Sequence, residues 1–138
     1  MTLADTMETA ESNTDEIIAI SQHERIIDAA RIMHEYRIGC LIVAADRSDE
    51  TMVGIISERD ILGWIGNATP ETYFQKVSDI MTTNVISCRP GASVSETLDQ
   101  MKRFHMRHMP IVENGKAVGM LSVRDLLERH FKSNTARI

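Results

Sequence analysis

The stretch GIISERDIL, residues Gly54–Leu62, returns late in the chain as GMLSVRDLL, residues Gly119–Leu127. Five of the nine positions are identical, and three more exchange one apolar residue for another. A second pair of segments, IIDAARIM (Ile26–Met33) and VSETLDQM (Val94–Met101), precedes the first pair in the same order and at nearly the same spacing. One short match could arise by chance, but two collinear matches in a chain of 138 residues indicate an internal duplication.

Each copy predicts the same five elements, in the order strand, helix, strand, strand, helix. The helices are predicted from apolar residues that recur with helical spacing, and the strands from short apolar runs bounded by turn residues. In the second copy, Asn114-Gly115 predicts a tight hairpin between the last two strands. The predicted elements cover residues 17–20, 26–33, 40–44, 52–57 and 58–65 in the first copy, and 85–88, 94–101, 109–113, 117–122 and 123–131 in the second.

The predicted fold class is therefore α+β, with two β-α-β-β-α repeats related by a pseudo-two-fold axis. Residues 1–69 are predicted to form the first repeat with an N-terminal segment. Residues 70–138 are predicted to form the second repeat with the linker and a C-terminal helix. A weak likeness between LADTM (residues 3–7) and VSDIM (residues 77–81) extends the duplication upstream of both repeats.

Charge and composition exclude several classes of function. The formal net charge is −5, so no overall positive field favours binding to nucleic acid or to an anionic membrane. The longest apolar run, residues 38–45, is too short to cross a bilayer. The N-terminal residues are acidic and polar, unlike a signal peptide, and the two cysteines lie in apolar stretches without metal or redox spacing. These features predict a cytoplasmic protein with reduced core cysteines.

The repeated segments resemble a tandem pair of cystathionine-β-synthase (CBS) domains. GIISERD and GMLSVRD fit that family's motif of glycine, a hydrophobic residue, any residue, Ser or Thr, two further residues and Asp. MHEYRIGCLIV and MKRFHMRHMPIV fit the helix-to-strand segments of its first and second repeats. The resemblance covers nearly the whole chain. It implies a stand-alone regulatory sensor that binds an adenosine-type ligand such as AMP, ATP, NAD or S-adenosylmethionine in clefts between the repeats, and that forms a homodimer.

The Ser-x-x-Asp core of each motif has two interpretations. A Ser at a strand end, followed by an acid three residues later, resembles a capping box that starts a helix. Alternatively, the helix N-terminus and the Ser hydroxyl could contact a phosphate, while Asp accepts hydrogen bonds from a ribose diol. Given the resemblance, the ligand role is preferred for Asp60 and Asp125, and Ser57 and Ser122 are expected to serve both purposes.

The resemblance also implies the other ligand contacts. Arg107 and His108 match a family position that commonly faces ligand phosphates, whereas Gly39 and Cys40 occupy the equivalent place in the first repeat. The alternative for the basic residues is a solvated helix end. The basic lining is thus expected on one side only. The remaining predicted nucleotide-binding residues, from the motifs and from the apolar walls around the adenine, are Arg59, Arg124, Ile18, Ile38, Ile86, Met106, Met109 and Pro110.

No catalytic role is predicted, because no nucleophile, acid–base pair or phosphate-binding glycine loop stands out. No metal site is predicted either, since His105 and His108 lack a third ligand. The main alternative function is a ligand-free structural or protein-interaction module that acts through dimerisation. An effector protein of unknown identity is an expected partner, whereas nucleic acid and membrane are not.

Overall fold

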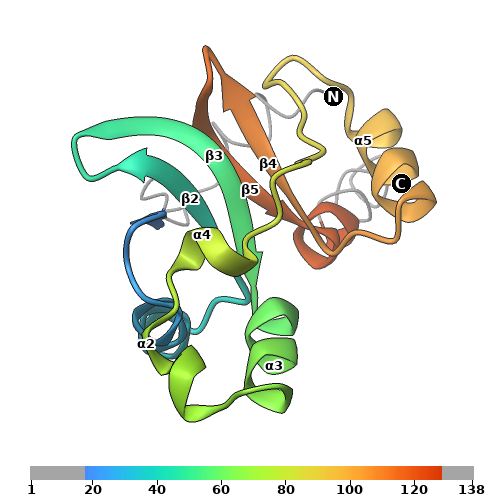
Figure 1. Cartoon of the computed structure of the whole chain (residues 1–138). Coiled ribbons are helices and arrows are strands. Elements are labelled where there is room, and N and C mark those ends of the chain that lie inside the picture. Colours follow the sequence, from blue (N-terminus) through green and yellow to red (C-terminus); the bar gives the residue numbers. More distant parts are fainter. Residues whose placement is uncertain (1–17, 129–138) are drawn as a thin grey trace. The chain divides into compact units, whose positions relative to one another are not determined.

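The computed structural model describes residues 18–128, which form parts of two compact units. The first unit comprises residues 18–85, and the second is described over residues 86–128. Each unit has its own buried hydrophobic core. The α+β fold predicted from the duplication is confirmed, with a strand–helix–strand–strand–helix order in the first unit (Figure 1).

The first unit is built on a long antiparallel hairpin with one short parallel strand beside it. Strand β1 pairs in parallel with β2, and β2 pairs with β3 in antiparallel fashion. Figure 1 shows the curved β2–β3 hairpin with helices α2 and α3 near one end of it. The elements are β1 (Ala19–Ser21), α2 (Ile26–Tyr36), β2 (Cys40–Asp46), β3 (Asp49–Ser57) and α3 (Glu58–Gly66).

Helix α2 buries the face that its sequence predicts. Ile26, Ala29 and Met33 are buried at helical spacing and join the core of the first unit. The helix ends because Arg37 adopts a left-handed conformation, with φ 54°, and its N–H donates to the carbonyl of Met33. The Ile38 N–H also donates to that carbonyl at 3.0 Å. This termination turns the chain directly into β2.

Residues 70–85 pack with the first unit. They include a 3₁₀ helix, Pro70–Phe74, and a short helix α4, Val77–Ile80. Val77 is fully buried, and its N–H donates to the carbonyl of Glu24 at 2.8 Å. The duplication predicts that this segment belongs to the second repeat as its linker. The predicted boundary at residue 69 marks where one copy of the duplication gives way to the next, and it stays a prediction. In the structure, the linker makes its contacts with the first unit.

The second unit repeats the helix and hairpin of the first. It contains α5 (Val94–Arg103), β4 (His108–Glu113) and β5 (Lys116–Ser122), followed by a helix from residue 123 that is described to residue 128. Ser93 caps α5, because its Oγ accepts the Glu96 N–H at 3.0 Å.

The predicted hairpin of the second unit is confirmed. Asn114 and Gly115 both have positive φ, 53° and 77°, between two antiparallel strands. That combination defines a type I′ turn, which matches the twist of the strands that it joins.

The strand predicted over residues 85–88 is reduced to a single parallel bridge between Cys88 and Ile111. The Cys88 N–H donates to the Pro110 carbonyl at 3.0 Å, and the Val112 N–H donates to the Cys88 carbonyl at 2.8 Å. Upstream, the Val85 N–H instead donates locally to the Thr83 carbonyl at 3.0 Å. To extend this parallel ladder upstream, residue 110 would have to donate its N–H to the Ile86 carbonyl. Residue 110 is proline and has no N–H, so the ladder stops at the one bridge.

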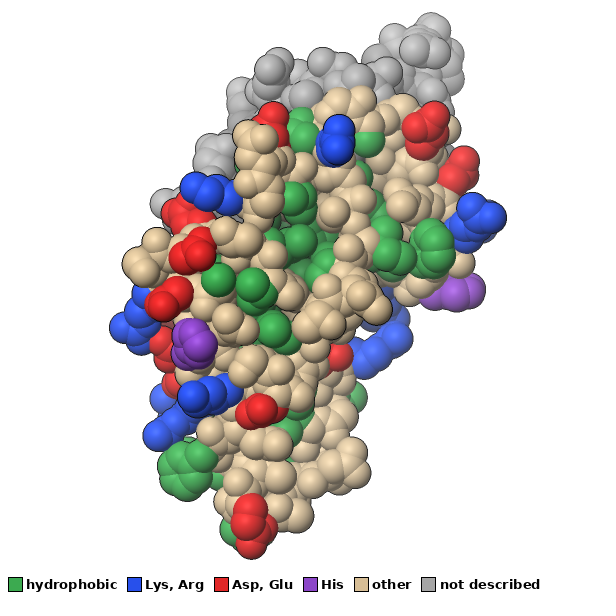
Figure 2. Space-filling model, turned by 45° about the horizontal axis from the view of Figure 1, so that its top comes forward, with side chains coloured by type: hydrophobic (Ala, Val, Ile, Leu, Met, Phe, Trp, Pro, Cys, Tyr) green, Lys and Arg blue, Asp and Glu red, His purple; other side chains and the backbone are tan. Residues whose placement is uncertain are grey.

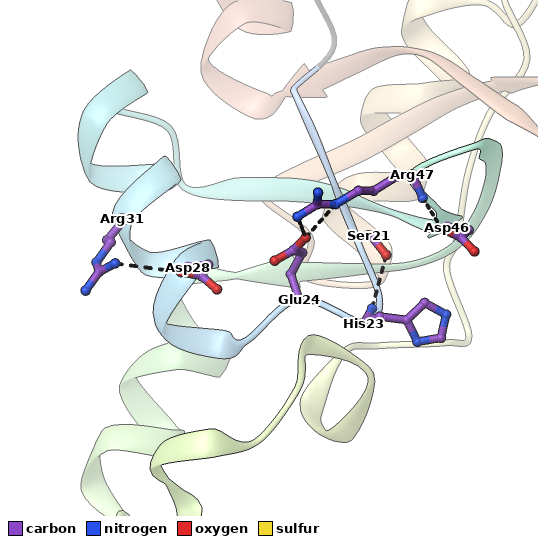
Figure 3. A network of polar contacts seen from close by, with 7 residues as sticks. All are labelled: Ser21, His23, Glu24, Asp28, Arg31, Asp46 and Arg47. Atoms are coloured by element: carbon purple, nitrogen blue, oxygen red, sulfur yellow. Dashed lines mark hydrogen bonds and ion pairs between the residues drawn. The ribbon is translucent and has the colours of Figure 1, made fainter.

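Polar contacts tie the loop after β1 to the β2–β3 turn (Figure 3). The Arg47 guanidinium donates to the Glu24 carboxylate, and the Gln22 side-chain amide donates to the Ala45 carbonyl at 3.0 Å. Acidic and basic side chains are interspersed over the face drawn in Figure 2, in agreement with the small net charge. Among the described residues, no helix has the length and apolar character needed to cross a membrane.

Candidate functional site

The Ser-x-x-Asp motif of the first unit lies where β3 ends and α3 begins. Ser57 is the N-cap of α3, and its Oγ accepts the Asp60 N–H at 3.2 Å. In return, Oδ2 of Asp60 accepts the Ser57 N–H at 2.9 Å and the Ser57 hydroxyl at 3.0 Å. These bonds form a complete capping box, so the structural interpretation of this motif is satisfied in the first unit.

The second motif has the same cap with a different carboxylate. Ser122 Oγ accepts the Asp125 N–H at 3.0 Å, as expected for the start of a helix. Within residues 18–128, the Asp125 carboxylate has no hydrogen bond or ion pair, and the residue is exposed. Asp60 is only partly exposed. The two aspartates therefore occupy equivalent positions in the repeats, but among the described residues only the Asp60 carboxylate accepts hydrogen bonds.

The segments that precede β2 and β4 approach the two motifs in the same way. The Glu58 N–H donates to the Gly39 carbonyl at 2.9 Å, and the Val123 N–H donates to the Arg107 carbonyl at 2.9 Å. The strand registers agree, because Cys40 lies opposite Ser57 and His108 lies opposite Ser122. The structure thus places Gly39 and Arg107 at equivalent points, each against the first turn of a motif helix.

Cys40 gives the first unit a neutral wall at this point. It is 6% exposed, and burial, together with the negative charge of Asp60, raises its pKa to about 12. Burial likewise raises the pKa of Cys88 to about 11. Both thiols are free and uncharged near neutral pH, so neither has the thiolate character of a nucleophile.

The other predicted contacts divide between the two units. Ile18 and Ile38 pack partly buried against the first core, and Ile86 and Met106 do so against the second. Met109 and Pro110 are fully buried, and Met109 belongs to the second core, so their side chains serve packing. Arg59 and Arg124 are exposed, and Arg124 forms an ion pair with Glu128 at 3.6 Å. No group of three His, Cys, Asp or Glu residues capable of holding a metal occurs in the described part of the chain.

The structure also gives the motif glycine of the first unit a role that the sequence analysis missed. A Cβ at Gly54 would lie 2.7 Å from the Thr82 carbonyl oxygen and 3.1 Å from the Met81 sulfur. Residues 81–82 reach Gly54 because Ile55 and Thr82 exchange backbone hydrogen bonds of 3.0 and 2.9 Å. The weakly repeated VSDIM segment ends at Met81, beside this contact, and its counterpart LADTM lies outside the described residues.

Comparison with known proteins identifies the family. The CBS domain profile matches residues 12–67 and 77–132, one match for each copy of the motif. The chain belongs to the CBS-domain family. One relative, an uncharacterised 17.7 kDa protein of Acidianus ambivalens, is 34% identical over 114 residues, which span 82% of this chain and 66% of the relative. This chain therefore matches about two thirds of that relative's length.

Solved CBS structures share the fold. A CBS-domain protein from Agrobacterium tumefaciens superposes with a TM-score of 0.81 at 25% identity, covering 94% of this chain and 92% of that one. CBSX2, solved in complex with AMP, gives a TM-score of 0.79 at 22% identity and covers 96% and 98% of the two chains. The CBS pair of protein MJ0100, solved with 5′-methylthioadenosine and S-adenosylmethionine, gives 0.72 at 22% identity and covers 97% and 98%.

Proposed function

We propose that this CBS pair is a non-catalytic regulatory module that binds an adenosine-type nucleotide. The observation that carries the proposal is the presence, in each unit, of a Ser-capped helix with Asp one turn in, set against the end of a buried strand. The AMP and S-adenosylmethionine complexes of structurally similar CBS proteins support it.

The chemistry of these groups suits an adenosine ligand. An aspartate carboxylate can accept hydrogen bonds from both ribose hydroxyls, each contributing about 1.5–3 kcal/mol because the acceptor is charged. The partial positive charge of a helix N-terminus favours a phosphate, and Arg107 would add a bidentate donor. Partly buried side chains such as Ile38 and Met106 would supply apolar walls for the purine. Binding in clefts between the repeats stays part of the proposal.

A thermal-shift panel tests the proposal directly. The purified, ligand-stripped chain would be heated with AMP, ADP, ATP, NAD, NADH or S-adenosylmethionine, with guanosine monophosphate as the matched control. A ligand at a hundred times its Kd adds about 2.7 kcal/mol of stability, which raises the melting temperature by several degrees. We expect a selective rise with one or more adenosine compounds. A flat response across the panel would contradict nucleotide binding.

The alternative is an interaction module that acts through dimerisation, and exposed apolar residues favour it. Leu62 and Ile65 on α3 are 70% and 57% exposed, and Leu127, which matches Leu62 in the repeat, is 40% exposed. Such residues fit a homodimer or an effector protein. Sedimentation of the wild-type chain and of the Leu62→Ser variant distinguishes a homodimer from a monomer that binds an effector protein. A dimer formed through α3 would dissociate in the variant. A wild-type monomer would leave an effector protein as the expected partner of the exposed apolar residues of α3.

A further inference from the structure

The two motif aspartates differ in how much of their hydrogen-bonding capacity is already used. Oδ2 of Asp60 accepts two hydrogen bonds from Ser57, one from its N–H and one from its hydroxyl. The Ser57 hydroxyl, which could otherwise donate to a ligand, is committed to the same carboxylate. A diol that needed both oxygens of Asp60 would have to break or share the bonds that start α3.

The Asp125 carboxylate accepts no such hydrogen bonds within residues 18–128. Its N–H is bonded to Ser122 Oγ at 3.0 Å, which starts the helix, while its carboxylate has no partner within residues 18–128. The Ser122 hydroxyl proton is also not used by this carboxylate. Both oxygens of Asp125 and the hydroxyl proton of Ser122 are therefore available to a ligand without loss of the cap.

The charges beside the two motifs also favour the second unit as the nucleotide site. At the equivalent backbone position the first unit has Gly39 and the second has Arg107. The first unit adds Cys40, a buried neutral thiol that contributes no charge to attract a phosphate. The second unit adds the exposed Arg107 guanidinium, a permanent cation with a planar set of donors. An anionic nucleotide is thus better matched by the second unit.

We infer that the two motifs bind nucleotide unequally: the Ser122–Asp125 motif provides the tight site, and Asp60 serves chiefly to cap α3. The inference rests on the proposed function and ranks its two motifs. Breaking even one of these hydrogen bonds to the charged Asp60 carboxylate weakens binding by roughly tenfold to a hundredfold. The first unit accordingly takes up nucleotide only at concentrations about tenfold or more above those that fill the second.

Matched Asp→Glu substitutions test this ranking. A capping box prefers Glu at its third position, so Asp60→Glu can keep the cap, whereas a diol clamp does not tolerate a carboxylate moved by one methylene. Isothermal titration of the full chain with AMP would be compared for wild type, Asp60→Glu and Asp125→Glu. We expect one tight AMP per chain in wild type, about tenfold or greater weakening of it in Asp125→Glu, and a change below about twofold in Asp60→Glu.

Stability provides the second readout. Asp60→Asn, which weakens the capping box, is expected to lower the melting temperature while leaving the tight AMP site in place. Asp125→Asn is expected to weaken AMP binding with a smaller change in melting temperature. The Asn pair therefore keeps the test informative if either Glu variant folds poorly.

The outcomes separate the ranking from the function on which it rests. Two AMP sites of equal affinity, or equal weakening in Asp60→Glu and Asp125→Glu, would overturn the ranking and leave nucleotide binding intact. Tight binding that is lost with Asp60→Glu alone would reverse the ranking. A wild-type chain that binds neither AMP nor any other adenosine compound of the panel would overturn the proposed function and the ranking together.

Discussion

The strand-to-helix junctions of the two units share the Ser-x-x-Asp motif but form different hydrogen bonds. In the first unit Ser57 and Asp60 satisfy one another, while in the second only the Asp125 N–H is bonded to Ser122. The comparison shows that a duplicated Ser-x-x-Asp motif can keep its helix cap in both copies and leave a carboxylate available in one. Cap and ligand contact are thus compatible uses of one motif.

The largest expected effect concerns the close approach at Gly54, a feature of the first unit. Gly54→Ala would place a methyl group 2.7 Å from the Thr82 carbonyl oxygen, so residues 81–82 would have to move. Overpacking of this kind costs about 1–3 kcal/mol. Urea unfolding followed by circular dichroism measures the change.

Gly63→Ala is the matched control. A Cβ at Gly63 meets nothing within 4 Å, and alanine in a helix is favoured over glycine by up to about 1 kcal/mol. We expect this variant to be as stable as wild type or more so. A Gly54→Ala variant with wild-type stability would show that residues 81–82 do not constrain the first unit.

A smaller effect tests the caps themselves. Ser57→Ala removes the acceptor for the Asp60 N–H and one of the two donors to the Asp60 carboxylate, so a loss of about 1–2 kcal/mol is expected. Ser122→Ala removes a single cap bond and is expected to cost about 0.5–1 kcal/mol.

Urea midpoints of the two serine variants, measured side by side without nucleotide, give the comparison. A larger loss for Ser122→Ala would mean that the second cap is the stronger one, against the hydrogen bonds described. Equal losses would show that the reciprocal bond of Asp60 adds no net stability.

The smallest effect at neutral pH is that of the two buried thiols, because their raised pKa values act only above about pH 9. Because the pKa values of Cys40 and Cys88 are raised to about 12 and about 11, the folded chain retains protons that the unfolded chain releases near pH 9. Each thiol therefore lowers the free energy of unfolding as the pH rises from about 9 toward its folded pKa, and below that range it has no effect.

Alkylation by iodoacetamide, monitored by mass spectrometry across this pH range, separates the two thiols. Cys88 is expected to react at a lower pH than Cys40, since only the thiolate attacks. Cys40→Ala and Cys88→Ala identify which thiol is modified. Faster alkylation of Cys40 would contradict the effects of burial and of Asp60 on its pKa.

Much of the fold could be predicted because its signals are local. The helical spacing of Ile26, Ala29 and Met33 fixed the buried face of α2, and Asn114-Gly115 defined the turn of the second hairpin. The strand expected over residues 85–88 was reduced to one bridge, because its partner Pro110 has no N–H to continue the ladder, and that partner lies far away in the sequence.

The equivalent placing of the two motifs could be predicted from the sequence, whereas the hydrogen bonds of their side chains could not. The duplication placed Gly39 and Arg107 at equivalent points, and the structure confirms that equivalence. The motif Ser-x-x-Asp does not determine whether its Asp carboxylate bonds back to the Ser. The same residues can form a complete capping box or leave the carboxylate available to a ligand. The contact of Thr82 with Gly54 joins residues far apart in the chain, so no local pattern could reveal it.

The type I′ turn at Asn114-Gly115 has a consequence for how quickly each unit can assemble. Strands β4 and β5 are joined by two residues, so their pairing closes a very short loop, and hairpins of this kind form within about 1–10 μs. Strands β1 and β2 pair in parallel only after the whole of α2 has bridged them, which costs more loop-closure entropy. The β4–β5 hairpin is therefore expected to be an early folding nucleus, with the β1–β2 pairing among the last contacts to form.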